Sequence, residues 1–276
     1  MRKTLSVASV ATKKTLQEFM LLKTTLEQYH DVDWHVSTDN VAHKELSKFS
    51  NIKSLELVKT DDCSHGSNDP IKNRLFLELV MTKFDALESA IDKNGYGLFL
   101  DSDIFFTNPI EDSVIQLFEN SQIDAVLSPH MTNNLVLETQ VGHFNVGFFS
   151  IRNKKMLRMH REMSWNHKEL GMYYEQQPIQ FCSYTFLTVN LPIKYNIGWW
   201  RFNEPHTKNR LNLLVADEDR LKFAGENAIC FHVHTLKDLD YTNFGIFLLD
   251  KVVELMKNCS NSKYDEIIRI IEQRHK

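Results

Sequence analysis

Short apolar runs typical of β-strands alternate with segments of helical periodicity through the first hundred residues of this chain. The strand-like runs cover residues 5–10, 34–38, 54–58 and 97–100, and the helical patterns cover 13–29, 71–91 and a shorter segment around Leu46 and Phe49. Parallel strands need a crossover connection, which is usually a helix. The alternation therefore predicts a doubly wound α/β half built on parallel strands.

The second half of the chain is less regular. Strands are expected at residues 125–127, 146–151 and 228–234, helices at 154–187, 244–257 and 264–273, a long loop at 130–142, and little periodicity from 198 to 226. A polar stretch at 60–70 is expected to be a surface loop. No repeat, low-complexity tract or linker divides the sequence, so we expect one domain over residues 1–276.

Composition limits the class of protein. The 276 residues are 42% hydrophobic and 25% charged, which allows a sizeable soluble core, and the net charge of −4 gives no indication of nucleic-acid binding. No run is apolar enough to span a bilayer, and polar residues interrupt the N-terminal segment, so we expect neither a transmembrane span nor a signal peptide. Four scattered cysteines, Cys63, Cys182, Cys230 and Cys259, favour free thiols and a cytoplasmic location.

Two acidic residues follow the buried strand at 97–100. Asp101 and Asp103 fall at its carboxyl end, where ligands bind in open α/β sheets. Carboxylates two residues apart can share one hard divalent cation, Mn²⁺ or Mg²⁺, which can also hold a diphosphate. The alternative is that one aspartate caps a following helix while the other is solvated. The position after a buried strand favours the metal site.

A second strand carries possible metal ligands. Side chains alternate across a strand, so His232 and His234 share one face while Ile229, Phe231 and Val233 share the other. If the apolar face is in the core, the histidines look toward the cleft, and a neutral imidazole can complete the shell of the cation. His234 is the slightly preferred ligand. The alternative is a packed histidine without a metal.

In order along the chain, several short motifs resemble those of the GT-A glycosyltransferases, most of all the glycogenin-like retaining group. They are Ser6–Ser9, Thr82–Lys83, Leu100–Asp103, Phe144–Gly147, Glu175–Gln176, Leu191–Asn196 and the histidine-bearing strand. The resemblance covers most of the chain. It implies an α/β GT-A fold with a mixed central sheet flanked by helices. It also implies a nucleotide-binding half at 1–106, an acceptor and sugar half at 107–242, and C-terminal helices at 243–276.

The resemblance also implies partners and a site. The partners are a nucleotide-diphosphate-sugar donor and a carbohydrate or other hydroxyl acceptor. The nucleotide is expected near Ala8, Ser9, Thr12 and Asp39, and the rest of the donor near Lys83, Ser102, Asn145 and Gly147. For Lys83 an exposed helix charge is an equally weighted alternative. For Gly147 the competing account is a strand bend.

One motif of the resemblance, Glu175–Gln176, bears on the stereochemistry of the reaction. The family often has Asp-Gln where this chain has Glu175 and Gln176, so either side chain can meet the transferred sugar. In an inverting enzyme Glu175 would serve as base. In a retaining enzyme Gln176 or Asn145 would position the sugar, and this is the favoured interpretation.

Other features allow further hypotheses. Trp199, Trp200 and Phe202 offer flat faces for an acceptor sugar, although core packing is the more ordinary role for at least one of them. The loop at 130–142 has the length and position of a lid over the donor.

Two other functions compete with sugar transfer. A haloacid-dehalogenase-like phosphatase also has Asp-x-Asp after a strand, with residues 215–220 as a possible distal acidic segment. Against it, about a hundred residues of α/β pattern precede the motif, which that fold would carry near its start. The third hypothesis is a module that binds nucleotide-sugars without turnover.

Overall fold

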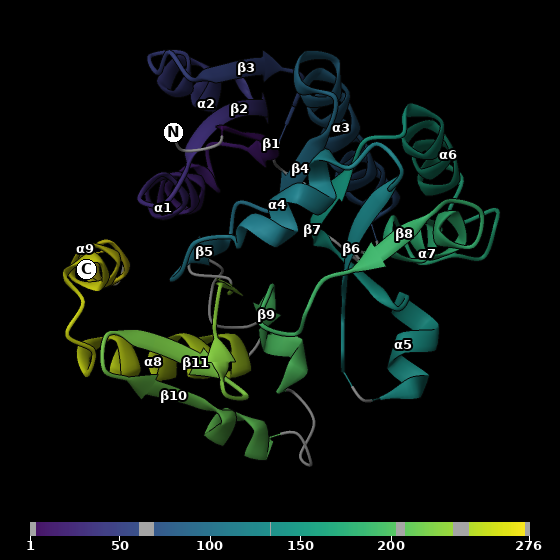
Figure 1. Cartoon of the computed structure of the whole chain (residues 1–276). Helices are drawn as coiled ribbons and strands as arrows, with labels where there is room; N and C mark the ends of the chain where they lie inside the picture. The colour runs from purple at the N-terminus through teal and green to yellow at the C-terminus, as the bar shows by residue number, and fades with distance from the viewer. Residues whose placement is uncertain (1–3, 61–68, 133, 203–207, 234–242, 274–276) are drawn as a thin grey trace.

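A computed structural model describes residues 4–60, 69–132, 134–202, 208–233 and 243–273 (Figure 1). The first half contains β1 (Thr4–Ala11), α1 (Leu16–Glu27), β2 (Asp31–Thr38), α2 (Asn40–Leu46), β3 (Ile52–Glu56), α3 (Pro70–Asn94) and β4 (Gly97–Leu100). Then follow β5 (Ile104–Phe106), α4 (Asp112–Glu119), β6 (Ala125–Pro129), α5 (Leu135–Val141), β7 (Phe144–Ile151), α6 (Lys154–Trp165), α7 (Gln176–Ser183) and β8 (Thr188–Asn190). The last part contains β9 (Ile197–Gly198), the 3₁₀ turns η1 (Trp199–Arg201) and η2 (Lys208–Leu213), β10 (Leu214–Asp217), β11 (Arg220–Phe223), β12 (Glu226–Asn227), β13 (Cys230–His232), α8 (Asn243–Lys257) and α9 (Ser262–Gln273).

The central sheet has seven strands in the order β3-β2-β1-β4-β7-β6-β8. Strands β3, β2, β1 and β4 are mutually parallel, as the alternating pattern of the first hundred residues predicts. Strand β7 runs antiparallel to both β4 and β6, so the sheet is mixed. The predicted fold class, an α/β fold with a mixed central sheet, is therefore confirmed.

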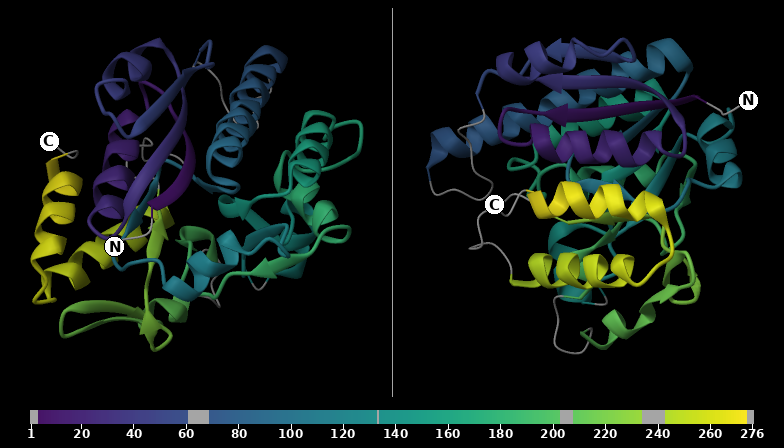
Figure 2. Two further views of the ribbon diagram at one scale, coloured as in Figure 1. Left: turned by 45° about the horizontal axis from the view of Figure 1, so that its top comes forward. Right: turned by 90° about the vertical axis from the view of Figure 1, so that its left-hand side faces the viewer.

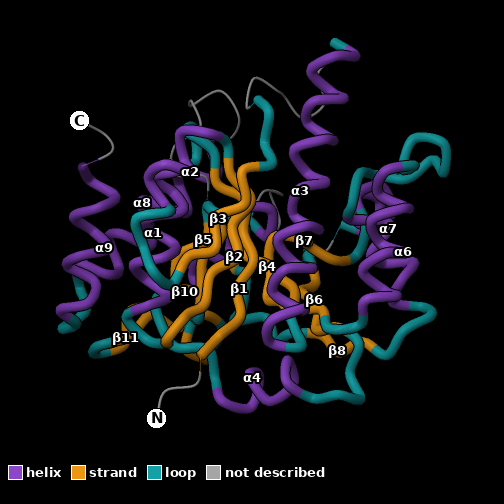
Figure 3. Tube along the Cα trace, turned by 90° about the horizontal axis from the view of Figure 1, so that it is seen from above, coloured by secondary structure: helices purple, strands orange, loops and turns teal. Residues whose placement is uncertain are grey.

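Helices cover both faces of the sheet. Helices α1 and α4 close one face over residues such as Leu5, Leu98 and Phe148, and α3, α6 and α7 close the other over Ala8, Phe99 and others. Figure 3 shows the strands between these two groups of helices. Strand β4 is fully buried because it lies between β1 and β7 with helices on both sides. The acidic residues that follow it are therefore at the edge of a rigid core.

A smaller layer lies beyond the carboxyl end of β4. A three-stranded sheet in the order β5-β13-β9 continues from that end, and a second one, β10-β11-β12, packs with α8 and α9. Figure 2 shows α9 beside α1, where Gln28 donates a 3.1 Å hydrogen bond to Glu266, with α8 on the other side of α9. Within the described ranges, no helix combines the length and apolar character that crossing a bilayer requires.

Three predicted segments differ from the structure. The helix expected over 154–187 is two helices, because α6 ends at Trp165 and the chain turns through Gly171 at φ 66° before α7 begins. The segment 198–226, expected to lack periodicity, holds β10, β11 and β12, whose pairing is local and too short to produce a pattern. The expected loop at 130–142 contains helix α5.

Tyr264 of α9 joins the C-terminal helices to the rest of the molecule. Its side chain is fully buried, and its hydroxyl accepts from the amide of Leu221 at 3.3 Å and donates to the carbonyl of Thr107 at 3.2 Å. Tyr264→Phe leaves the Leu221 amide without this acceptor and is expected to lower the free energy of unfolding by about 1–3 kcal/mol. Urea denaturation followed by circular dichroism measures this. If residues 1–276 form one domain, the variant unfolds in one transition at lower urea; a separate early transition would show that the C-terminal helices unfold independently.

Candidate metal centre

Asp101 and Asp103 lie in the tight reversal between β4 and β5. The amide of Asp101 donates to the carbonyl of Gly147 on β7 at 2.8 Å, and the amide of Ile104 donates back to the carbonyl of Asp101 at 3.2 Å. The Asp103 carbonyl accepts from the amide of Val233 at 3.0 Å. The backbone of the acidic motif is therefore held by two neighbouring strands, which leaves its carboxylates free to point into the site.

His232 of β13 completes a group of three possible metal ligands. Its Nε2 lies 3.0 Å from Oδ1 of Asp103 and 3.7 Å from Oδ2 of Asp101. One ligand atom from each residue lies within 4.8 Å of the others, and no other such group of histidines, cysteines and acidic residues occurs in the described ranges. Two carboxylate oxygens and an imidazole nitrogen suit a divalent cation such as Mn²⁺. The predicted alternative ligand, His234, lies outside the described residues.

Gly147 makes this convergence possible. A Cβ atom at this position would lie 2.3 Å from Cε1 of His232 and 2.5 Å from Oδ2 of Asp101. No side chain fits there, so β7 approaches the two ligands through its backbone alone. The close packing of His232 and Asp101 requires a glycine here, and contact of Gly147 with a sugar stays a prediction.

The site concentrates negative charge. Burial raises the pKa of Asp101 above its ordinary value, and the carboxylates of Asp103 and Glu175 act in the same direction, against the opposite effects of Lys83 and His232. A buried carboxyl whose pKa is raised by neighbouring carboxylates, as at Asp101, is typical of functional sites.

A cavity of about 250 Å³ opens beside the two aspartates. Its walls come from β1, α1, α3 and β4, together with the residue just before α7. They include six of the residues that the sequence singled out: Thr12, Lys83, Asp101, Ser102, Asp103 and Glu175. Residues far apart in the sequence therefore meet in one cavity at the carboxyl edge of the sheet, where an open α/β fold binds its ligand.

Lys83 and Glu175 form a buried ion pair in the wall of this cavity. Lys83 Nζ lies 2.9 Å from Oε1 of Glu175 and 4.7 Å above the ring of Phe99, and the lysine is only 4% exposed. Burial acts to raise the pKa of Glu175, but the charge and hydrogen bond of Lys83 outweigh it, so the pKa is lower than usual. The alternative of an exposed helix charge at Lys83 is wrong.

The residues expected around the nucleotide are divided between the cavity and the core. Ala8 and Ser9 are fully buried in β1, and the Ser9 hydroxyl donates to the carbonyl of Leu100 at 2.7 Å. Asp39 lines a different cavity of about 430 Å³. It caps α2 through the Ala42 amide at 2.8 Å and accepts from the Lys13 amide at 2.7 Å. Nucleotide contact by these three residues stays a prediction.

The two amides expected near the sugar are both largely buried. Oδ1 of Asn145 accepts from the amide of Gly147 at 2.9 Å, and its Nδ2 lies 3.4 Å from Nε2 of His130. The side-chain oxygen of Gln176 is buried and has no hydrogen-bond partner among the described residues. A buried acceptor without a donor is costly unless a ligand satisfies it.

The aromatic residues after β9 pack rather than form an open platform. Trp200 is 8% exposed; its Nε1 donates to the carbonyl of His130 at 3.0 Å, and its ring meets that of His232 edge-on at 5.0 Å. Phe202 is buried in the core of the C-terminal layer, and Trp199 packs at its border. The indole of Trp200 thus supports the candidate metal ligand.

Two residues beside the site were not identified from the sequence as functional. Asn196 accepts from Nδ1 of His232 at 3.0 Å, and His130 is bonded through Nδ1 to the carbonyl of Gly142 at 2.8 Å. Burial lowers the pKa of His130 to about 4, so its ring is neutral. Sequence periodicity predicts neither contact, although Asn196 does end one of the motifs used for the family resemblance.

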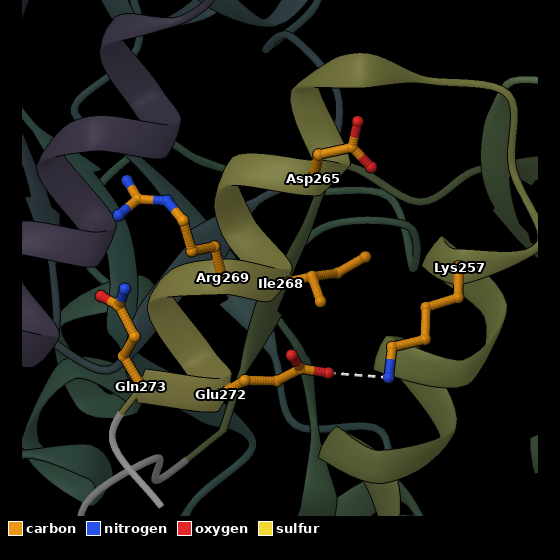
Figure 4. Close-up of a pocket in the computed structure, with 6 residues that line it drawn as sticks. All are labelled: Lys257, Asp265, Ile268, Arg269, Glu272 and Gln273. Atoms are coloured by element: carbon orange, nitrogen blue, oxygen red, sulfur yellow. Dashed lines mark ion pairs between the residues drawn. The ribbon is translucent and has the colours of Figure 1, made fainter. Parts of the chain in front are cut away.

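A crevice of about 390 Å³ lies elsewhere, on the C-terminal helices (Figure 4). Lys257 of α8 and Glu272 of α9 face each other across it with a 2.7 Å ion pair. Charged side chains of both signs line it, and it contributes nothing to the candidate metal group.

Comparisons with known proteins agree with this geometry. No protein-family model and no curated protein sequence matches the chain. Solved glycosyltransferases do match its structure. The galactosyltransferase LgtC, solved with donor and acceptor sugar analogues, gives a TM-score of 0.55 at 13% identity, over 96% of this chain and 100% of LgtC. This chain has the GT-A fold.

Two further GT-A structures extend the comparison. Mouse xyloside xylosyltransferase 1, in its apo form, gives a TM-score of 0.54 at 11% identity over 83% of this chain and 97% of its own. The glycosyltransferase GlyE of Streptococcus pneumoniae gives 0.57 at 12% identity over 97% of this chain and 63% of its own. The predicted resemblance to GT-A glycosyltransferases is therefore confirmed at the level of the fold, and the glycogenin-like subgroup stays a prediction.

The Lys83–Glu175 pair makes a pH-dependent prediction. Because the folded pKa of Glu175 lies below its ordinary 4.5, the pair stabilises the protein above that pH and loses its effect as the pH falls. Lys83→Met leaves a buried carboxylate unpaired, so we expect a loss of about 3–5 kcal/mol near neutral pH. This loss of unfolding free energy should shrink in acid, where the Glu175 carboxyl becomes protonated in the folded as well as the unfolded protein. Urea denaturation from pH 7 to pH 4 measures it.

Lys93→Met is the matched control. Lys93 belongs to the same helix and pairs with Asp33 at 2.8 Å, but its side chain is 57% exposed. Its removal is expected to cost less than about 1 kcal/mol. Equal losses from the two variants, or a Lys83→Met deficit that does not change with pH, would contradict the role given to the buried pair.

Proposed function

We propose that this protein is a metal-dependent glycosyltransferase that moves a sugar from a nucleotide-diphosphate-sugar donor to an acceptor hydroxyl. The observation that carries the proposal is the meeting of Asp101, Asp103 and His232 in a GT-A fold, where the two aspartates also line a cavity. These three residues would hold Mn²⁺ or Mg²⁺. When bound, the cation neutralises the charge that develops on a departing diphosphate.

Other residues of the chain would contact the donor. Lys83 supplies positive charge to the cavity wall beside the aspartates, and Thr12 and Ser102 offer hydroxyl groups to a ligand there. Gly147 lets His232 and Asp101 pack against the β7 backbone, so that both side chains can reach one cation. Asn145 and Gln176 offer amide groups to the sugar hydroxyls, and the unsatisfied oxygen of Gln176 supports such a contact.

A retaining reaction fits the site better than an inverting one. A general base works best when its pKa lies near the operating pH. Glu175 has a lowered pKa and an ion pair with Lys83, so it is a weak base whose negative charge is already compensated. Glu175 then fixes Lys83 while Gln176 or Asn145 positions the sugar.

The two competing functions have less support. The phosphatase hypothesis needs a haloacid-dehalogenase-like fold, whereas the chain has the GT-A fold, and its acidic residues 217–219 form the end of β10 and the turn to β11. The binding-only hypothesis predicts an incomplete site. Three convergent ligands beside a cavity favour turnover instead.

Asp103→Ala is expected to abolish metal-dependent sugar transfer, and Asp101→Ala to reduce it to a similar or lesser degree, with melting temperatures close to the wild type. The donor is first found by measuring thermal stabilisation with a panel of nucleotide-sugars, with and without Mn²⁺, because a ligand that binds only the native state raises its stability. Full activity in both variants would count decisively against the site. Release of phosphate from simple phosphomonoesters would favour the phosphatase.

The stereochemistry of the product tests the retaining proposal. Proton NMR of the product formed by the wild-type protein gives the anomeric configuration, which we expect to equal that of the donor. An opposite configuration would rule out retention. In that case Glu175→Gln should remove the activity, because Glu175 would then act as base.

A further inference from the structure

Asn196 occupies a strained and buried position between β8 and β9. It is 0% exposed, and its φ of 50° lies in the left-handed region that asparagine tolerates better than most residues. Its backbone amide donates to Sγ of Cys230, the first residue of β13, at 3.2 Å. A polar side chain in such a place needs partners for all of its hydrogen-bonding groups.

The partners of Asn196 follow from one unambiguous donor. The backbone amide of Gly147 can only donate, so the atom of Asn145 that lies 2.9 Å from it is the oxygen Oδ1. That same oxygen lies 2.9 Å from Asn196, so the Asn196 atom facing it is the NH₂ group, which also lies 3.0 Å from Oγ of Ser128. The oxygen of Asn196 must therefore face His232.

This arrangement fixes the position of one hydrogen on the imidazole of His232. Oδ1 of Asn196 lies 3.0 Å from Nδ1 of His232, so Nδ1 carries the hydrogen and donates it. In the neutral ring, Nε2 then presents its lone pair toward Asp103, 3.0 Å away, and Asp101. This is the tautomer that a metal ligand through Nε2 requires.

The hydrogen bonds form a chain that runs in one direction. His232 donates to Asn196, Asn196 to Asn145, Asn145 to His130 at 3.4 Å, and His130 to the carbonyl of Gly142 at 2.8 Å. Each donor group polarises the next, and such chains are stronger than isolated bonds. The chain joins the candidate metal ligand to the residue expected to contact the sugar.

We propose that Asn196 is a positioning residue that orients His232 for metal binding by accepting its Nδ1 hydrogen. The inference rests on the proposed metal site and goes beyond it, because it assigns the metal affinity partly to a residue that touches neither metal nor donor. Partners of this kind behind metal-bound histidines change affinity by about 10–100-fold when they are removed.

The test compares three variants by their affinity for Mn²⁺ alone, measured from the electron paramagnetic resonance signal of free Mn²⁺. Asn196→Gly removes the side chain but keeps the left-handed backbone accessible, so the loss is not one of backbone strain. We expect its affinity to be about 10–100-fold weaker than that of the wild type. Asn196→Asp keeps an acceptor for Nδ1 and tolerates the same backbone, but it replaces the NH₂ group that faces Asn145 and Ser128 with an oxygen. Its affinity should therefore be weaker than that of the wild type but clearly stronger than that of Asn196→Gly.

Asn108→Ala is the matched structural control. Asn108 is also a buried asparagine, and its amide donates to the carbonyl of Ala228 at 2.7 Å, but it has no bond to His232 in the described structure. The Asn108→Ala substitution should lower the melting temperature without changing the affinity for Mn²⁺. Thermal melts of all variants, without metal, establish that each is folded.

The outcomes separate this inference from the proposed function. Wild-type affinity in Asn196→Gly, an equal weakening in Asn108→Ala, or an Asn196→Asp variant as weak as Asn196→Gly would each overturn the positioning role. In those cases the metal site still stands if Asp103→Ala loses Mn²⁺. A wild-type protein that binds no Mn²⁺ overturns both.

Discussion

The close approach of three backbone segments at Gly147 is the constraint on which the rest of the site depends. Strand β7 lies beside β4. Because Gly147 of β7 has no Cβ atom, His232 and Asp101 can occupy the space next to it. The carbonyl of the same glycine fixes the Asp101 amide, and its amide fixes the oxygen of Asn145. One residue without a side chain thus holds Asp101, a candidate metal ligand, and Asn145 in place.

The buried Lys83–Glu175 pair organises the other side of the cavity. It joins α3 to the start of α7, which are far apart in the sequence, and it places a cation close to the acidic motif without neutralising it. His160 adds to this arrangement, because its Nε2 bonds the Glu175 carbonyl at 2.8 Å. A site with a fixed positive charge near an acidic motif suits a donor that combines a charged diphosphate with a neutral sugar.

The sequence predicted the parallel half of the sheet and the acidic motif well, because both depend on local patterns. An apolar run of four residues ended by aspartates identifies β4 and its carboxyl edge without knowledge of the fold. The division of the 154–187 segment into two helices was not predicted, because it depends on a turn with a left-handed Gly171. The hairpin of β10 and β11 was missed because each strand has only four residues, too few for the alternation in β11 to stand out.

The choice between His232 and His234 stayed open in the sequence, which by itself determined the fold class and the position of Asp101 and Asp103 at the end of a buried strand. These follow from periodicity and from the geometry of strands. Only the tertiary structure decided that Lys83 is buried against Glu175, that Trp200 packs on His232, and that Asn196 sets the orientation of the imidazole. Those contacts join residues many positions apart, and their pairing depends on side-chain directions that no local pattern encodes.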